Sequence, residues 1–452
     1  MGKEAARGTD PVATFYKSTF VWYNSSMNNL YENNEGASLN PPRAILAGLE
    51  LNEDISYYMA ELSGLAEAAG IEVIGELIQS RARPQSATYL GSGKTDELAQ
   101  LCVDMEADMV IFDNELSGVQ LRNLEDKLNV KVIDRTILIL DIFAERATSK
   151  EGKLQVELAQ LQYRLPRLTG FGKALSRLGG GIGTRGPGEK KLETDRRHIK
   201  RKMDDIKREL EEARNNRNIK RSQREKSGIP MVALVGYTNS GKSALMNRFL
   251  ANNMKEDKTV TEKDMLFATL DTSHRNIKLD TNHEFILIDT VGFVSNLPHT
   301  LIKAFKATLE EVNYADLLLH VVDASYEEND FHIDVTKQVL REIGAGDKDK
   351  ILVYNKIDLL DEAERFRYEG QDSICLSAKY GENMDDLVGM IKDRIFGNRI
   401  PTALLIPFDR GDIYSDLCNR YRVENTDYAE KGTYLNVELS PEDFHRLEAY
   451  RV

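Results

Sequence analysis

Short apolar runs alternate with amphipathic helical segments along much of the chain, and this pattern predicts an α/β protein. Between residues 41 and 147, helical patterns such as Ile55–Ala69 and Thr95–Glu106 separate four apolar runs. The four runs predict strands at Arg43–Leu49, Glu72–Ile78, Asp108–Asp113 and Val130–Asp134. Strands that alternate with helices in this way favour a parallel sheet. We therefore expect residues 41–147 to form an N-terminal α/β domain.

Residues 148–228 have the pattern of two amphipathic helices joined by glycines. Leucines recur at steps of four and three from Leu154 to Leu168, which is the spacing of one apolar helix face. Six of the eleven residues Leu178–Gly188 are glycine. The charged stretch Glu189–Lys226 then carries an apolar stripe at Leu192, Ile199, Met203, Ile206 and Leu210. The pattern predicts an antiparallel helical hairpin, with a second helix roughly 55 Å long.

The last two parts of the chain predict a large and a small folded unit. In residues 229–398, successive buried strands predict a mostly parallel sheet with helices on both faces. Residues 399–452 predict a small α+β module, with strands at Ala403–Pro407 and Thr433–Leu439 and helices at Gly411–Arg420 and Pro441–Tyr450. Residues 1–40 are polar and rich in Asn and Ser, which predicts a flexible arm.

The segment Gly236-Tyr-Thr-Asn-Ser-Gly-Lys-Ser243 follows the apolar strand Met231–Val235 and precedes a helical pattern. It matches the phosphate-binding pattern G-x-x-x-x-G-K-[ST]. The glycines allow a tight turn whose N–H groups point at a phosphate, and the lysine and serine supply a positive charge and a Mg²⁺ ligand. The phosphate-binding candidates are Gly236, Asn239, Ser240, Gly241, Lys242, Ser243 and Gly292.

A second motif, Asp289-Thr290-Val291-Gly292-Phe293, ends a buried strand and predicts a switch segment. Asp289 can hold Mg²⁺ together with Ser243 and Thr269, and Gly292 can donate its N–H to a γ-phosphate. For Thr269 the rivals are Thr259, Thr261 and Thr272. Phe293 stands where many small GTPases carry a water-orienting glutamine. The structural interpretation is a hydrophobic plug in a switch loop, and the functional corollary is slow intrinsic hydrolysis that needs a partner.

Two further strand-end motifs indicate which base is bound. The carboxylate of Asp358 can accept two hydrogen bonds from a guanine edge, whereas adenine lacks that pair of donors and would leave the carboxylate unpaired. The loop after the strand at residues 374–376 can supply an N–H to the guanine carbonyl oxygen. GTP and GDP are thus the expected ligands, bound by Asn355, Lys356, Asp358, Ser377, Ala378 and Lys379.

The segment Gly91-Ser-Gly-Lys-Thr95 resembles the end of a second phosphate loop. The first glycine of the motif is missing, because Thr88 occupies its position. No apolar strand leads directly into the segment either. We expect a structural turn into a helix, and a nucleotide or RNA contact through Lys94 is the alternative.

Composition narrows the classes of function. No run of about eighteen apolar residues is present, so no transmembrane segment is expected. Cys102, Cys375 and Cys418 are scattered without metal-ligand spacing, which favours free thiols in the cytoplasm. The net charge of -13 disfavours non-specific binding to DNA.

Residues 190–226 carry a positive net charge, in contrast to the negative net charge of the whole chain. They contain fifteen Lys and Arg against eight Asp and Glu, a local charge of +7. Intrahelical pairs such as Lys207–Glu211 and Arg208–Glu212 would make this a solvated structural helix. The glycine-rich segment with Arg185 and Lys190 instead favours RNA, because glycines admit close approach to phosphates.

These features together resemble the HflX family of ribosome-associated GTPases over about residues 41–452. The most specific matches are Tyr89–Lys94, Phe112–Ser117, Val132–Ala147 and Gly179–Glu189. The resemblance implies a GTPase that binds ribosomal RNA and protein of the large ribosomal subunit, is stimulated there, and splits stalled or idle ribosomes after stress. Separately, we expect a monomer. It implies that the hairpin loop, about Leu178–Lys191, approaches the peptidyl-transferase centre. The RNA-contact candidates are Gly181, Gly183, Arg185, Gly186, Gly188, Lys190 and Lys191.

The resemblance leaves several points open. In related GTPases an asparagine at the position of Asn239 helps to bind K⁺, and Ser240 stands where alanine is frequent. Two other functions are compatible with the motifs. One is a GTPase that acts through a protein partner without RNA, and the other is an ATP-using or non-catalytic RNA remodeller.

Overall fold

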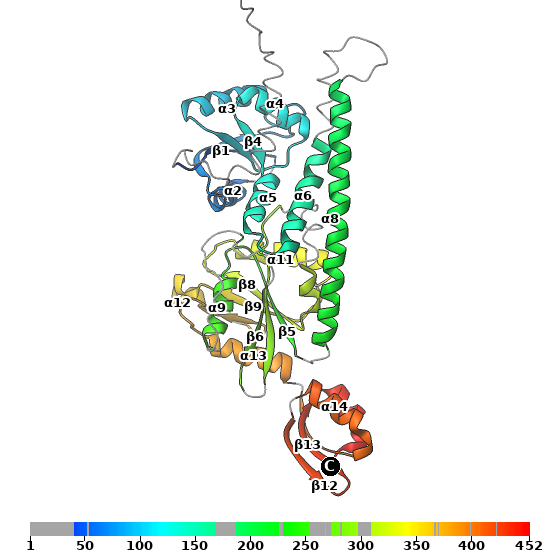
Figure 1. Cartoon of the computed structure of the whole chain (residues 1–452). Helices are drawn as coiled ribbons and strands as arrows, with labels where there is room; N and C mark the ends of the chain where they lie inside the picture. Colours follow the sequence, from blue (N-terminus) through cyan, green and yellow to red (C-terminus); the bar gives the residue numbers. More distant parts are fainter. Residues whose placement is uncertain are drawn as a thin grey trace, which may run out of the picture. The chain divides into compact units, whose positions relative to one another are not determined.

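The computed structural model describes twelve segments of the chain, and Figure 1 draws them in colour. The described residues are 40–51, 54–167, 187–225, 229–252, 267, 273–280, 283–296, 309–365, 368, 370–397, 399–421 and 423–452. Thr269 and its rivals Thr259, Thr261 and Thr272 lie outside them, as do the arm and most of the glycine-rich segment.

A four-stranded, all-parallel sheet organises the N-terminal unit, in the order β2-β1-β3-β4. Its strands are β1 (Arg43–Glu50), β2 (Glu72–Ser80), β3 (Met109–Phe112) and β4 (Lys131–Asp134). The helices are α2 (Ser56–Ala68), α3 (Ser92–Asp104), α4 (Gly118–Leu128) and α5 (Arg135–Arg146). The predicted parallel sheet is confirmed, and each strand ends within two residues of its predicted bounds.

Helices cover both faces of this sheet (Figure 1). Leu46 and Ile111 share one apolar cluster with residues of α2 and α5, whereas Ile45 and Val110 share the other with α3 and α4. Successive residues of a strand point to opposite faces, so a sheet covered on both sides needs continuous apolar strands. Ala44–Leu49 is such a run, which is why the sequence pattern identified it.

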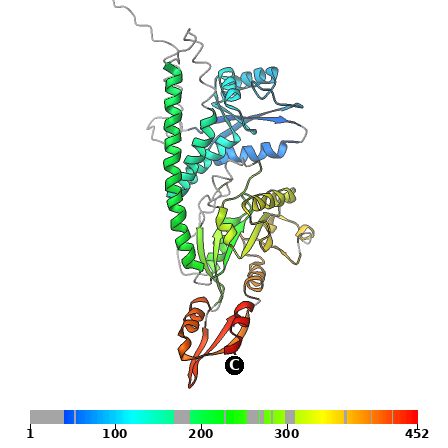
Figure 2. The same ribbon diagram turned by 90° about the vertical axis from the view of Figure 1, so that its right-hand side faces the viewer.

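The helical middle region consists of α6 (Lys150–Arg167) and α8 (Pro187–Glu225), which lie side by side in both views (Figures 1 and 2). Ion pairs join Lys150 to Glu209 at 2.8 Å and Glu151 to Arg217 at 2.9 Å. Early residues of α6 thus meet late residues of α8, and the helices are antiparallel as predicted. Leu158, Leu161 and Ile206 form their buried seam.

One detail of the predicted hairpin is wrong. Lys207 and Arg208 pair with Asp204 and Asp205, three residues earlier, and not with the glutamates four residues later. Both spacings bring side chains together on one helix face, so the sequence alone does not decide between them.

The second sheet has six strands in the order β10-β9-β8-β5-β7-β6. They are β5 (Met231–Val235), β6 (Ser273–Lys278), β7 (Glu284–Asp289), β8 (Leu317–Asp323), β9 (Lys350–Asn355) and β10 (Ser373–Cys375). Among the described strands of this sheet, β6 alone is antiparallel to its neighbour. The mostly parallel sheet predicted from the sequence is therefore confirmed.

Helices flank the second sheet on both sides. They are α9 (Lys242–Asn252), α11 (Asn329–Ile343), α12 (Glu362–Arg365) and α13 (Met384–Phe396), with single turns at η2 (Glu310–Tyr314) and η3 (Ile357–Leu359). Residues of α9 and α13 share one apolar cluster with the sheet, and residues of α11 share another.

The C-terminal unit is a three-stranded antiparallel sheet, ordered β11-β13-β12. It comprises β11 (Ile400–Ile406), β12 (Val423–Ala429), β13 (Gly432–Leu439), α14 (Gly411–Arg420) and α15 (Pro441–Arg446), with turns at η5 (Phe408–Arg410) and η6 (Glu448–Tyr450). The predicted α+β module is confirmed. Strand β12 was not predicted, because its edge position tolerates polar residues such as Glu424, Asn425 and Asp427.

No helix in the part of the chain that the structure describes is long and apolar enough to cross a bilayer.

Candidate functional site

The loop Gly236–Ser243 joins β5 to α9 at the carboxyl edge of the second sheet, where parallel strands commonly hold ligands. Two glycines give the loop its shape. Gly236 has φ 147° and Gly241 has φ 91°, both in the region that disfavours other residues. A Cβ on Gly241 would lie 2.1 Å from Asn355 Nδ2. The loop can therefore close against β9 only because glycine stands there.

Lys242 is buried within the curve of this loop. Its Nζ donates to the carbonyl of Gly236 at 3.1 Å and to the carbonyl of Tyr237 at 2.6 Å. Burial lowers its pKa to about 8, while the carboxylate of Asp289 acts in the opposite direction. The ammonium is held by backbone carbonyls, so its charge is available to an incoming anion. This is the arrangement that phosphate binding requires.

Ser243 and Asp289 approach each other although 46 residues separate them in the sequence. Ser243 Oγ, in the first turn of α9, donates to Asp289 Oδ2 at 3.0 Å. A hydroxyl and a carboxylate are hard oxygen donors, and Mg²⁺ commonly takes one or two such groups together with phosphate oxygens. The residues present fit Mg²⁺. Thr269, the third predicted ligand, lies outside the described residues.

The segment after Asp289 is paired with the phosphate loop. Phe293 N donates to Gly236 O at 3.1 Å, and Thr238 N donates to Phe293 O at 2.7 Å. A Cβ on Gly292 would lie 3.1 Å from Lys242 Nζ, so the backbone of Gly292 runs close to the lysine. The Phe293 side chain is only 2 % exposed and packs with Val235 and Ile288. It is a hydrophobic plug that contacts the core and not solvent.

The predicted guanine-binding residues are brought together from two loops. Asn355 Nδ2 donates to Ser240 O at 2.9 Å, and its Oδ1 accepts from Ala378 N at 2.9 Å. Asp358 Oδ1 accepts from Ser377 Oγ at 2.6 Å. Lys356 has φ 66° and pairs with Asp323 at 2.8 Å. Asn355 thus ties the loops of the predicted guanine-binding residues to the phosphate loop.

Sequence reasoning missed Arg248, which braces the same loop. Its Nε donates to Ala378 O at 2.9 Å, and its guanidinium also contacts the carbonyl of Lys379. Arg248 lies on α9, six residues past Lys242. No motif covers that position, so only the fold reveals its role.

The glycine-rich turn Gly91–Thr95 has the features of a structural element. Gly91 is the N-terminal cap of α3, and Thr95 Oγ1 donates to Gly91 O at 2.9 Å. Lys94 pairs with Glu97 at 2.8 Å. These contacts support the structural interpretation. Of the RNA-contact candidates, Gly181, Gly183, Arg185 and Gly186 lie outside the described residues, and Gly188, Lys190 and Lys191 fall within the first five residues of α8.

Three family models match consecutive parts of the chain. They are described as "GTP-binding GTPase N-terminal" for residues 56–144, "GTP-binding GTPase Middle Region" for residues 146–224 and "50S ribosome-binding GTPase" for residues 231–356. Together they cover three of the folded regions described above.

Curated relatives match over nearly the whole chain. A protein of Caldanaerobacter subterraneus named GTPase HflX is 46% identical over 433 residues, covering 96% of this chain and 97% of its own length. GTPase HflX of Escherichia coli is 40% identical over 394 residues, covering 86% of this chain and 91% of its own. Among solved structures, a GTP-binding protein from Sulfolobus solfataricus in complex with GDP is 25% identical, with a TM-score of 0.42, covering 78% of this chain and 99% of its own.

Proposed function

Because this chain belongs to the HflX family of GTPases and hydrolyses GTP, we propose that it acts on ribosomes. In this proposal it binds the large ribosomal subunit in its GTP-bound state and separates stalled or idle ribosomes under stress. One observation carries the proposal: the residues predicted to bind phosphate and guanine lie together at one sheet edge, and a long basic helix occurs in the same chain. The description of the matching family model, a 50S ribosome-binding GTPase, supports it.

Several basic side chains of helix α8 are not paired with acidic side chains of the described residues. Arg196, Lys200, Arg201 and Arg214 make no ion pair within the described residues. Lys200, Arg201 and Arg214 are exposed. Unpaired cationic side chains along one helix can neutralise the backbone phosphates of a nucleic acid. This electrostatic contribution is often the largest part of the affinity of proteins for nucleic acids. We infer that α8 and the glycine-rich segment, which includes Arg185, contact ribosomal RNA.

The site supplies most of the groups needed for hydrolysis. Lys242 and the loop N–H groups would hold the phosphates, Ser243 and Asp289 would hold Mg²⁺, and Thr269 would complete its shell once GTP is bound. Asn239, exposed and at φ 60°, is the candidate K⁺ ligand. Bound Mg²⁺ would neutralise charge on the β- and γ-phosphates. Asp358 and Ser377 would select guanine.

Among the described residues, the switch segment offers no side chain at the position of Phe293 that could orient the attacking water. Phe293 is buried as a plug and cannot hydrogen-bond a water. The isolated protein should therefore hydrolyse GTP slowly, and the ribosome would complete the site. Binding of GTP and of the ribosome would then favour each other by the same coupling free energy.

The first experiment measures GTP hydrolysis by the purified protein alone, with large ribosomal subunits, and with small subunits as the control. We expect the large subunit to raise kcat by at least about tenfold, which corresponds to about 1.4 kcal/mol of transition-state stabilisation. Equal rates in all three reactions, with GTP still bound, would contradict the proposal. They would favour a GTPase that acts through a protein partner, whose complex should be insensitive to salt.

A further inference from the structure

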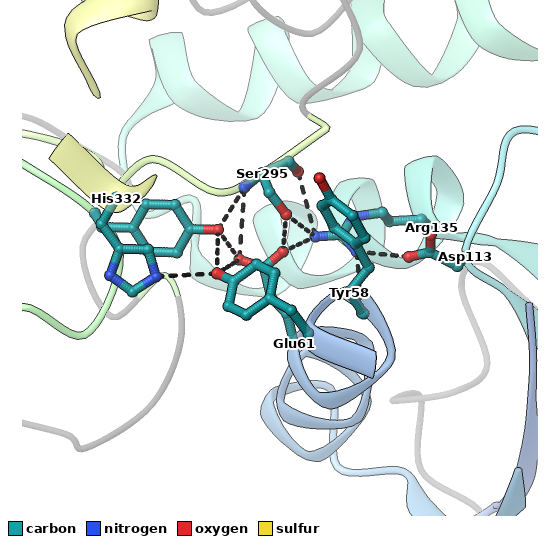
Figure 3. Close-up of polar contacts among 8 residues, drawn as sticks. Tyr58, Glu61, Asp113, Arg135, Ser295 and His332 are labelled. Carbon is teal, nitrogen blue, oxygen red and sulfur yellow. Dashed lines mark hydrogen bonds and ion pairs between the residues drawn. The ribbon is translucent and has the colours of Figure 1, made fainter. Parts of the chain in front are cut away.

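A buried polar cluster joins the N-terminal unit to the nucleotide site (Figure 3). We call it the Glu61 cluster, and it comprises Tyr57, Glu61, Asp113, Arg135, Tyr237, Ser295 and His332. Glu61, on α2, is 8% exposed. Its carboxylate accepts hydrogen bonds from Arg135, from the Tyr237 hydroxyl and from the Ser295 hydroxyl. One side chain of the N-terminal unit is thus the common acceptor for two residues of the nucleotide-binding unit.

Both of those residues belong to segments that form the phosphate site. Tyr237 is the second residue of the phosphate loop, and its carbonyl accepts from Lys242 Nζ at 2.6 Å. Ser295 follows the switch segment by two residues, and its N–H donates to the Tyr237 hydroxyl at 2.6 Å. Glu61 therefore holds the Tyr237 side chain of the phosphate loop and Ser295, just after the switch segment, in fixed positions relative to each other. Neither residue has a role in the phosphate-binding motif itself.

The charges in the cluster demand a fixed geometry. Arg135, 2 % exposed, contacts Glu61 and also donates to Asp113 Oδ1 at 2.7 Å and to Ser295 O at 3.2 Å. These carboxylates raise the pKa of Arg135, whereas burial acts to lower it. Burying charged groups costs free energy and is tolerated only when their partners are well placed. Any shift of Ser295 or Tyr237 would therefore weaken the contacts that offset this cost.

Aromatic contacts restrain the tyrosine further. The Tyr237 ring stacks on His332 with centroids 3.9 Å apart, and Tyr57 Oη donates to Tyr237 Oη at 2.8 Å. Burial and the Glu61 carboxylate raise the pKa of Tyr237, which keeps its hydroxyl protonated as a donor. The Tyr237 hydroxyl is therefore held by three hydrogen bonds, which it makes with Glu61, Ser295 and Tyr57.

Apolar contacts extend the same interface to the segment that precedes Thr269. Phe267 packs edge-on against Phe143 of α5 at 4.6 Å, and its N–H donates to Thr238 Oγ1 at 2.8 Å. Val291 and Val294, on either side of Phe293, belong to the same apolar cluster as α2 and α5. The N-terminal unit thus contacts the phosphate loop and the described parts of both segments that GTP is expected to order.

We propose that Glu61 is a positioning residue for GTP hydrolysis, acting through Tyr237 and Ser295. By holding these two residues together, Glu61 sets the distance between the phosphate loop and Gly292, whose N–H is expected to bind the γ-phosphate. The inference rests on GTP hydrolysis by the isolated protein and not on the proposed ribosome interaction. A failure of ribosomal stimulation would leave it untouched.

The test compares Glu61→Gln, Tyr237→Phe and the double variant with Glu67→Gln. Glu67 lies on the same helix and is exposed, so its variant controls for loss of a carboxylate on α2. The readouts are kcat for GTP without ribosomes, the dissociation constant for GDP, and the melting temperature. Tyr237→Phe removes one charge-assisted hydrogen bond and should lower kcat about tenfold, and Glu61→Gln weakens three such bonds and should lower kcat at least as much. GDP lacks a γ-phosphate, so its affinity should change less than about twofold.

The double variant distinguishes positioning from general destabilisation. If Glu61 acts through Tyr237, the double variant should have nearly the same kcat as the slower single variant. Multiplicative losses, or parallel falls in kcat, GDP affinity and melting temperature, would overturn the proposal. An unchanged or increased kcat in a folded Glu61→Gln protein that binds GDP would overturn it as well.

Discussion

At the scale of single residues, the phosphate site depends on backbone positions that accept only glycine. Gly241 combines φ 91° with a Cβ position 2.1 Å from Asn355 Nδ2. That amide also donates to Ser240 O, so it cannot move aside without releasing the loop. One methyl group would therefore disturb the phosphate loop and a base-binding residue together.

Gly241→Ala should abolish measurable GDP binding, because the alanine is strained at this φ and collides with Asn355. Gly389→Ala is the matched control. Gly389 lies in α13 with nothing within 4 Å of its Cβ position, and alanine there should stabilise the helix by up to about 1 kcal/mol. Isothermal titration with GDP and thermal unfolding measure both effects. Normal GDP affinity in Gly241→Ala would show that the loop is less constrained than its geometry indicates.

At the scale of elements, helix α5 carries Asp141, a carboxylate whose negative charge is poorly stabilised by its neighbours. Asp141 is partly buried, and its Oδ1, which is shielded from solvent, has no hydrogen-bond partner among the described residues. Burial raises its pKa from 3.8 to about 6, opposed by the charges of Lys131 and Arg164. The folded protein then holds a proton that the unfolded chain releases, so stability falls as pH rises from about 4 to 6.

Asp141→Asn should remove this pH dependence. At pH 4 both proteins carry a neutral side chain and should be about equally stable. Well above pH 6 the ionised aspartate destabilises only the parent, so the variant should be more stable by about 3 kcal/mol. Denaturant unfolding at pH 4.5 and pH 8 measures the difference. Glu145→Gln, on the exposed side of α5, should show no such change, and a pH-independent difference for Asp141→Asn would refute the assignment to ionisation.

At the scale of the whole molecule, α8 gives a positive surface to a chain with a net charge of -13. The helix is fixed along α6 by ion pairs and by the seam of Leu158, Leu161 and Ile206. Among its described side chains, Arg196, Lys200, Arg201 and Arg214 make no ion pair and could contact a partner. If that partner is RNA, affinity must fall with salt in proportion to the number of phosphates contacted.

Two neighbouring Lys-Arg pairs allow a matched comparison. Lys200→Gln/Arg201→Gln removes exposed charges without ion pairs, and Lys207→Gln/Arg208→Gln removes charges already paired with Asp204 and Asp205. The first variant should weaken binding to the large subunit and lower the slope of log K against log salt by about 1 to 2. The second should change the slope less. Equal slopes for all three proteins would exclude this part of α8 from the RNA contact.

The sequence alone predicted the three sheets, the helical hairpin and the nucleotide motifs, because each depends on local information. A strand buried on both faces must be continuously apolar, as Ala44–Leu49 is, and a phosphate loop needs its glycines and lysine at fixed spacing. The pairing of Ser243 with Asp289 also follows from the motifs. Less regular elements, such as the polar edge strand β12, were not predicted.

Only the tertiary structure decided which residues from distant parts of the chain meet at the site. Arg248 braces the base-binding loop, and Glu61 contacts Tyr237 across 176 residues of sequence. Neither residue stands in a motif, because each is selected by burial and by partners that folding brings together. The burial of Phe293 in the core likewise depends on tertiary packing. Local patterns determine elements and motifs, whereas the contacts that couple them depend on the packing of the whole chain.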